Sequence, residues 1–151
     1  MLSKTSEYAL RAVLFLARQP RDLPVRASDV ATGLGVPANY LSKVLHTLSR
    51  EGVVTSERGP GGGFRLTRPP HRTTLAQVVE PFDAFNSRDL CLLGRRRCHD
   101  DKPCGAHERW REVFDPVIDF FRETMVAELL EPGGEALESL TLEGGARGTE
   151  R

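Results

Sequence analysis

The chain has 151 residues, of which 39% are hydrophobic, and this supports one domain built around a single core. No apolar stretch reaches the roughly 18 residues that a membrane span requires, and no signal peptide precedes the first amphipathic segment, so we expect a cytoplasmic protein. The net charge is zero, yet residues 1–72 carry 11 basic against 5 acidic side chains, and residues 73–151 carry 10 against 16. A polyanion-binding surface is therefore expected in the first half of the chain.

Apolar residues at helical spacing predict three helices in the first fifty residues, over about residues 3–19, 29–34 and 37–51. Ser28 is expected to cap the second helix, since a serine hydroxyl accepts a hydrogen bond from an unpaired backbone N–H of the first turn. A glycine-containing turn separates the second helix from the third. This order predicts a helix-turn-helix over about residues 27–51.

The outward face of the third helix carries hydrogen-bonding and cationic side chains and almost no acid, namely Asn39, Tyr40, Ser42, Lys43, His46, Thr47 and Arg50. Such side chains can contact base edges in the major groove of DNA. Periodicity alone fits an ordinary solvated helix face equally well. The segment that follows the helix favours the DNA-binding interpretation.

Residues 53–67 predict a β-hairpin with a glycine-rich tip, because two strand-like runs flank the segment Arg58-Gly59-Pro60-Gly61-Gly62-Gly63. The backbone at Gly61 and Gly62 can approach a partner closely, and Arg58 is placed to enter a narrow, negative minor groove. A loop for nucleotide phosphates is less consistent with this segment, since it matches neither of the usual glycine-rich phosphate motifs. A helix-turn-helix followed by a hairpin is a winged helix, expected over residues 1–80.

All three cysteines of the chain lie in a loop-like stretch, residues 81–107, which follows a short helix that Thr74 is expected to cap. Six residues separate Cys91 from Cys98, five separate Cys98 from Cys104, and His107 follows after two more. Three thiolates and an imidazole can fill the four ligand positions of a metal or cluster site. Because thiols stay reduced in the cytosol, a disulfide is not expected.

An apolar stripe predicts a long helix over residues 108–131, and Pro116 in its middle is expected to kink it. The small domain before this helix leaves little core for the stripe to cover, so we expect it to pair with a second copy of the chain. Residues 132–151 contain few large apolar side chains and are expected to be disordered. The predicted fold class is mainly α with a small β-hairpin: a winged helix-turn-helix domain plus a long C-terminal dimerisation helix.

Five segments together form a more specific pattern: Ser6-Glu7-Tyr8-Ala9-Leu10-Arg11-Ala12, Tyr40-Leu41-Ser42-Lys43-Val44-Leu45, Gly52-Val53-Val54, the hairpin from Arg58 to Phe64, and Cys104-x2-His107 with Trp110-Arg111. Over about residues 1–130 the chain resembles bacterial winged-helix regulators of the Rrf2 type, typified by the IscR-like and NsrR-like iron-sulfur regulators. The resemblance implies a homodimeric DNA-binding transcription factor, expected to be a repressor. An iron-sulfur cluster that senses redox state, nitric oxide or iron would control its affinity for the operator.

The resemblance also implies roles for individual residues. Asn39, Ser42 and Lys43 would meet the major groove, and Arg58 would enter the minor groove. Cys91, Cys98 and Cys104 would bind the cluster, with one residue more between the first two than is usual in the family.

The fourth ligand has two candidates. His107 would complete a 2Fe-2S site, whereas Glu7 from the other subunit would complete a 4Fe-4S site. We favour His107, because a histidine three residues after Cys104 is already positioned locally. A winged-helix regulator with a structural zinc site of three cysteines and a histidine is the alternative, and a small iron-sulfur redox protein is a remote one. No catalytic motif accompanies the cysteines, so we do not expect an enzyme.

Overall fold

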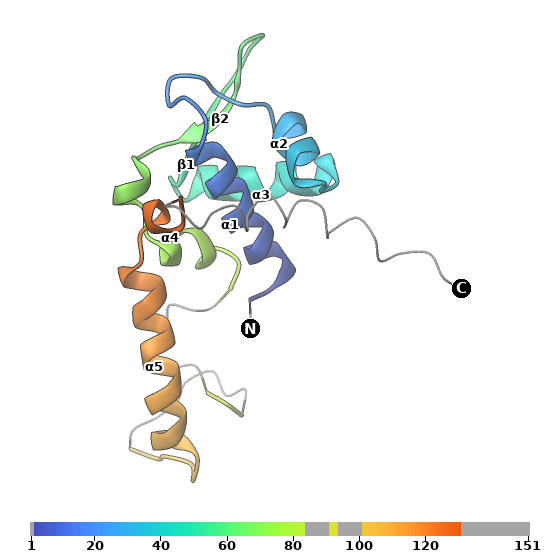
Figure 1. The fold of residues 1–151 in the computed structure, drawn as a ribbon. Helices are drawn as coiled ribbons and strands as arrows, with labels where there is room; N and C mark the ends of the chain where they lie inside the picture. The colour runs from blue at the N-terminus through green and yellow to red at the C-terminus, as the bar shows by residue number, and fades with distance from the viewer. Residues whose placement is uncertain (1, 84–90, 94–100, 131–151) are drawn as a thin grey trace, which may run out of the picture.

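The computed structural model describes residues 2–83, 91–93 and 101–130, which form a winged helix and a helix that projects away from it (Figure 1). In chain order the elements are α1 (Lys4–Ala17), α2 (Ala27–Leu34), α3 (Ala38–Arg50), β1 (Val54–Glu57), β2 (Gly63–Leu66), η1 (Pro70–Arg72), α4 (Leu75–Val79), α5 (His107–Glu123) and η2 (Val126–Leu130). The predicted fold class, mainly helical with a two-stranded hairpin, is confirmed. The segment over residues 132–151, predicted to be disordered, lies outside the described residues.

Helix α1 lies at the centre of the core. Ser3 caps it, because the Oγ of Ser3 accepts a hydrogen bond from the backbone N of Ser6 at 3.2 Å. Its inner face is fully buried at Ala9, Ala12 and Val13, and these small side chains let the neighbouring elements approach closely. Helices α2, α3 and α4, strand β2 and η2 all contact α1. The helix therefore connects α2, α3 and the hairpin to the end of the described chain.

Helices α2 and α3 form the predicted helix-turn-helix. Gly35 ends α2 in the left-handed conformation, with φ of 64°, which suits glycine because it has no Cβ. The prediction that Ser28 caps α2 is wrong. The helix already begins at Ala27, since the carbonyl of Arg26 accepts the first helical hydrogen bond from Val30 at 3.1 Å, and no side chain caps the helix. Ser28 therefore lies inside the first turn.

The hairpin that forms the wing is an antiparallel pair of strands in which Val54 lies opposite Leu66. Phe64 points into the core from β2 and also pairs with Val25, which lies in the segment between α1 and α2. The N of Val25 donates to the carbonyl of Phe64 at 2.9 Å, and the N of Phe64 donates back at 2.7 Å. The wing is therefore held both by the pairing of its two strands and by hydrogen bonds to the segment that leads into the helix-turn-helix.

Helix α4 begins with a capping box, in which Thr74 and Gln77 exchange hydrogen bonds between side chain and backbone. Helix α5 ends at Glu123, so it is shorter than the helix predicted over residues 108–131. The chain then turns back onto the winged helix, since the N of Val126 donates to the carbonyl of Thr73 at 2.8 Å. Val126 is fully buried there. Burial of η2 against α1 and η1 explains why the apolar pattern continues after the helix has ended.

Candidate nucleic-acid interface and cysteine segment

The structure places most of the predicted DNA-reading side chains on the outer face of α3. Asn39, Lys43, His46 and Arg50 are exposed, and Ser42 is half-buried. The opposite face of the helix is buried in the core through Leu41, Val44, Leu45 and Leu48. The core therefore fixes which side of α3 is presented to a partner.

Tyr40 occupies a different position from the other residues of this predicted set. Its hydroxyl forms a hydrogen bond with Thr5, and its ring packs edge-on against Tyr8, with the ring centroids 5.6 Å apart. Both of those partners belong to α1. Tyr40 therefore attaches the start of α3 to α1, and its contact with DNA stays a prediction.

His46 links the recognition helix to the wing. Its ring lies edge-on to that of Phe64 in β2, with centroids 5.3 Å apart. One turn further along, Arg50 donates to the hydroxyl of Thr47 at 3.4 Å. The contact between His46 and Phe64 therefore joins α3 to the hairpin, the two elements predicted to face DNA.

The tip of the wing is held by contacts that the sequence did not reveal. Arg26, just before α2, donates to the carbonyl of Pro60 at 2.9 Å. Arg58 is exposed beside Gly59, which has φ of 102°. A Cβ at Gly61 would meet nothing within 4 Å, whereas a Cβ at Gly62 would collide with the backbone of the turn itself. Gly61 thus offers an open backbone surface, while Gly62 is required for the turn to form.

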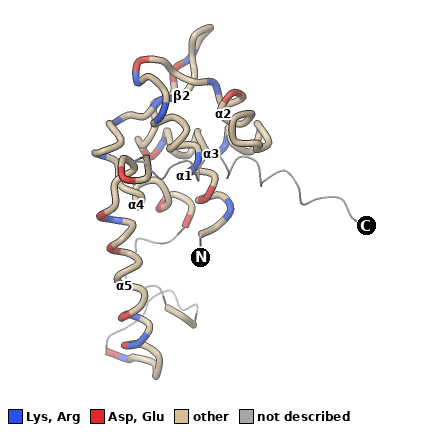
Figure 2. The backbone as a smooth tube through the Cα atoms, in the orientation of Figure 1, with Lys and Arg blue, Asp and Glu red and all other residues tan. Residues whose placement is uncertain are grey.

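Charges of both signs cover the winged helix. Figure 2 shows Lys and Arg positions interspersed with Asp and Glu positions over this part of the molecule. One acidic side chain, Glu57 on β1, forms an ion pair with Arg65 on β2, with 2.6 Å between Oε1 and Nε. The carboxylate of Glu57 is therefore paired with Arg65 and not with Arg58 at the tip. The basic surplus of the first half is therefore distributed over several elements.

The structure describes three of the four preferred metal ligands. Cys91 and His107 are buried, with 9% and 7% of their surface exposed, and Cys104 is half-buried. The backbone N of His107 donates to the carbonyl of Cys104 at 3.0 Å, so these two residues lie in one turn at the start of α5. Cys98 lies outside the described residues. Within residues 2–83, 91–93 and 101–130, no three His, Cys, Asp or Glu side chains come together as a metal site.

Glu7, the other candidate for the fourth ligand, lies in the first turn of α1. Its carboxylate accepts a hydrogen bond from the Nζ of Lys4 at 2.8 Å. This hydrogen bond, followed by the charge of Glu7, raises the pKa of Lys4. The side chain of Glu7 remains 42% exposed, and Lys4 uses only its Oε2.

A further contact fastens the start of α1 to the beginning of the cysteine segment, residues 81–107. The backbone N of Ser3 donates to the carboxylate of Asp83 at 2.9 Å. Burial acts to raise the pKa of Asp83, but the Ser6 hydroxyl and the Ser3 donors outweigh it, and the pKa lies below its ordinary value. Because the two residues are 80 positions apart, no local sequence signal indicates this contact.

The projecting helix α5 presents apolar side chains to solvent. Val113 is 64% exposed and Phe120 is 54% exposed, while the rings of Trp110 and Phe114 stack with centroids 5.1 Å apart. Pro116 lies inside α5 without ending it, and the predicted kink stays a prediction. Within the described residues, none of the helices has the length and apolar character needed to cross a membrane.

Comparison with known proteins gives consistent results. The model of the Rrf2 family, described as an iron-dependent transcriptional regulator, matches residues 2–132. An HTH-type transcriptional regulator of Aquifex aeolicus is 36% identical over 132 residues, covering 86% of this chain and 91% of that protein. The HTH-type transcriptional regulator IscR of Pectobacterium carotovorum is 30% identical over 129 residues, covering 85% of this chain and 78% of that protein.

Solved structures share the fold. CymR of B. subtilis, described as its global cysteine regulator, superposes with a TM-score of 0.72 at 21% identity, covering 85% of this chain and 95% of CymR. IscR of T. potens superposes with a TM-score of 0.69 at 21% identity, covering 90% of each chain. At this level of identity the superpositions establish the architecture alone.

Proposed function

Because the chain belongs to the Rrf2 family of transcriptional regulators, we propose that it is a homodimeric repressor whose affinity for its operator is controlled by an iron-sulfur cluster. As a member of this family it is a DNA-binding transcriptional regulator and not an enzyme. One observation carries the cluster part of the proposal: Cys104 and His107 share a hydrogen-bonded turn at the start of α5. The thiol of Cys91 and the imidazole of His107 are buried and Cys104 is half-buried, and such donors suit a cluster or a soft metal ion.

In the proposed complex, α3 enters the major groove and the wing lies along the minor groove. Asn39, Ser42 and Lys43 would contact base edges or phosphates, and Arg58 would enter the minor groove. The exposure of Asn39, Lys43 and Arg58 supports these roles. Tyr40 and His46 would mainly orient α3, since each has a packing partner on a neighbouring element.

We assign the cluster to Cys91, Cys98 and Cys104, with His107 as the favoured fourth ligand of a 2Fe-2S site. A bound cluster would supply a redox-active centre at the start of α5, where Cys104 and His107 lie. The fixed turn between Cys104 and His107 supports this choice, whereas Glu7 is engaged with Lys4. Glu7 remains the alternative ligand, for a 4Fe-4S site.

The contacts at both ends of the cysteine segment suggest how its state would reach the DNA-binding elements. At the beginning of the segment, Asp83 holds the start of α1 through Ser3. After α5, the carbonyl of Thr124 accepts a hydrogen bond from the N of Leu75 in α4 at 3.0 Å. Both α4 and α3 pack against α1. A rearrangement between these two attachments would therefore displace α1 and α4 and alter the position of α3.

Dimerisation through α5 would cover the exposed apolar surface of Val113 and Phe120. A symmetric pair is expected, because DNA operators for helix-turn-helix proteins contain two related half-sites. Sedimentation of the purified protein should show a dimer, and Phe120→Glu should shift it toward the monomer. A monomeric wild-type protein at micromolar concentration would contradict this part of the proposal.

The decisive experiment is anaerobic purification followed by measurement of iron, sulfide and zinc, with visible and EPR spectra. Iron and sulfide with visible absorption are the expected result, and operator affinity should differ between the cluster-loaded and the cluster-free protein. Stoichiometric zinc without visible absorption would instead establish the structural zinc site. Equal operator affinities of the two forms would refute cluster control.

Variants distinguish the two candidates for the fourth ligand. Glu7→Gln should keep the wild-type spectrum if His107 is the ligand, whereas His107→Ala should lose or alter it. His107→Cys supplies another ligand at the same position and should restore cluster binding with a shifted spectrum. Loss of the cluster in Glu7→Gln alone would overturn the assignment to His107.

A further inference from the structure

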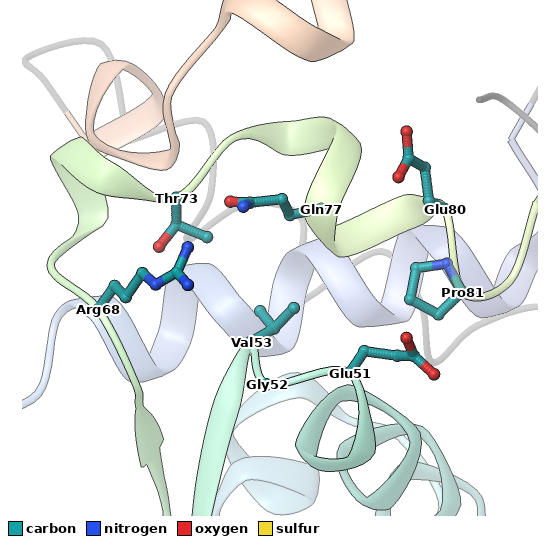
Figure 3. Close-up of a pocket in the computed structure, with 8 residues that line it drawn as sticks. All are labelled: Glu51, Gly52, Val53, Arg68, Thr73, Gln77, Glu80 and Pro81. Carbon is teal, nitrogen blue, oxygen red and sulfur yellow. The ribbon is translucent and has the colours of Figure 1, made fainter.

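A cavity of ≈ 360 Å³ lies between the end of α3 and α4, and its lining contains none of the predicted DNA-contacting residues and none of the predicted metal ligands. Its lining comes from the turn between α3 and β1, the chain after β2, and α4: Glu51, Gly52, Val53, Arg68, Thr73, Gln77, Glu80 and Pro81 (Figure 3). Pockets for small ligands begin at about 300 Å³. The cavity is therefore large enough for a small metabolite.

The charged side chains of this cavity are separated by sign. In Figure 3, Arg68 lies on one side, whereas Glu51 and Glu80 lie together on the other side, next to Pro81. Within the described part of the chain, none of these three side chains forms an ion pair, either with one another or with other residues. Opposite charges that face one cavity without contacting each other leave room for a molecule that carries both charges.

The groups between the charged ends are suited to a small polar ligand. The Oε1 of Gln77 is used by the capping box, where it accepts from the N of Thr74 at 3.0 Å, so the amide Nε2 remains as a donor. Thr73 is only 3% exposed, and its hydroxyl donates to the carbonyl of Pro69 at 3.3 Å. The hydroxyl oxygen of Thr73 can therefore still accept a hydrogen bond. Val53 supplies an apolar wall.

We propose that this cavity binds a free α-amino acid, with the ligand carboxylate on Arg68 and its ammonium group near Glu51 and Glu80. A guanidinium binds a carboxylate through two parallel hydrogen bonds, and carboxylates suit an ammonium group. An anion without an amino group would face two glutamates, and an amine without a carboxylate would face Arg68. The charge pattern thus selects a zwitterion over either half of it.

The position of the cavity connects such a ligand to DNA binding. Glu51 is the C-cap of α3, and Val53 immediately precedes β1 of the wing. A ligand that joins these residues to α4 would restrict the recognition helix and the wing relative to the rest of the domain. This consequence, unlike the binding itself, rests on the proposed DNA-binding function, and we expect operator affinity to change when the amino acid is bound.

The test uses the full-length protein, purified anaerobically with whatever metal or cluster it carries, and calorimetric titration with each of the twenty protein amino acids. At least one should bind. Its decarboxylated amine and its deaminated acid should each bind roughly tenfold or more weakly, because each lacks one charge-assisted contact. No binding by any of the twenty at millimolar concentration would overturn the proposal, as would equal binding of the amine or the acid.

Matched variants test the location. Arg68→Gln and Glu80→Gln should each weaken binding of the amino acid by roughly 10- to 100-fold. Arg72→Gln is the control, since Arg72 is an exposed arginine of η1, four residues further along, that does not line the cavity. Retention of wild-type affinity in both cavity variants would overturn the assignment. Operator binding is measured separately on the same samples, so failure of DNA regulation and failure of amino-acid binding give different results.

Discussion

Replacing Gly63 by alanine should weaken the wing's attachment to the domain. A Cβ at this position would collide with the backbone of Val25 and Arg26, and backbone atoms cannot rotate away as a flexible side chain can. To avoid this collision, the wing must move away from the backbone of Val25 and Arg26. Such a movement would strain or break the two hydrogen bonds between Val25 and Phe64, at 2.9 and 2.7 Å. Each such bond contributes about 1 kcal/mol, and overpacking typically costs about 1 to 3 kcal/mol.

The wing can either stay in place with the collision or move away and lose those hydrogen bonds, so the two costs do not add. We therefore expect a loss of about 2 kcal/mol in the free energy of unfolding. Gly61→Ala provides the matched control, because a Cβ there meets nothing within 4 Å. The control should change stability by about 0.5 kcal/mol or less.

Urea unfolding followed by circular dichroism measures both variants in the same cluster state. Operator affinity, unlike stability, should fall for the Gly61→Ala control, because a methyl group at Gly61 would lie on the surface proposed to approach DNA. Equal unfolding free energies for Gly63→Ala and Gly61→Ala would refute the close approach between the wing and the segment before α2.

Three further outcomes are expected. Asp83 has a lowered pKa in the folded protein, so its contribution to stability is present above its unfolded value near 3.8 and is lost as the pH falls through the lower folded value. Urea unfolding from about pH 6 down to about pH 2 should show this loss in the wild type and a weaker one in Asp83→Asn, and parallel curves would contradict it. Arg58→Ala should weaken operator binding about tenfold, most strongly for operators with A·T-rich minor grooves, and unchanged fluorescence anisotropy titrations would show that the hairpin does not enter the groove. Tyr40→Phe removes the hydrogen bond to Thr5 and should lower the free energy of unfolding by about 1 kcal/mol. If thermal melts instead show wild-type stability while operator affinity falls, Tyr40 contacts DNA and does not serve to orient α3.

Local elements were predictable because their signals are contained in short stretches of sequence. The capping of α4 by Thr74 depends only on residues within one turn, and the structure shows the capping box. The hairpin was indicated by two strand-like runs around a glycine-rich tip, and β1 pairs with β2 as that pattern requires. Where the local signal competed with the path of the chain, the prediction failed: Ser28 is a good cap by type, but the chain enters α2 at Arg26, two residues earlier.

The apolar stripe after the cysteine segment shows how one pattern can have two structural causes. The sequence predicted a single helix over residues 108–131 for pairing with a second chain. In the structure Phe121 and Val126 are buried in the winged-helix core, whereas Val113 and Phe120 remain exposed on α5. Periodicity identifies apolar faces but cannot say which surface covers them, because that depends on where the chain turns at Thr124.

The sequence by itself determined the residue chemistry: an outward polar face on α3, a wing tip of glycines beside Arg58, and a spacing that brings Cys104 and His107 into one turn. Only the tertiary structure decided the contacts between residues distant in the chain, such as Ser3 with Asp83 and Arg26 with Pro60. It also created the cavity between α3 and α4, whose lining comes from three separate segments. The physical reason is that local propensities act over a few residues, whereas these contacts depend on how the common core brings whole elements together.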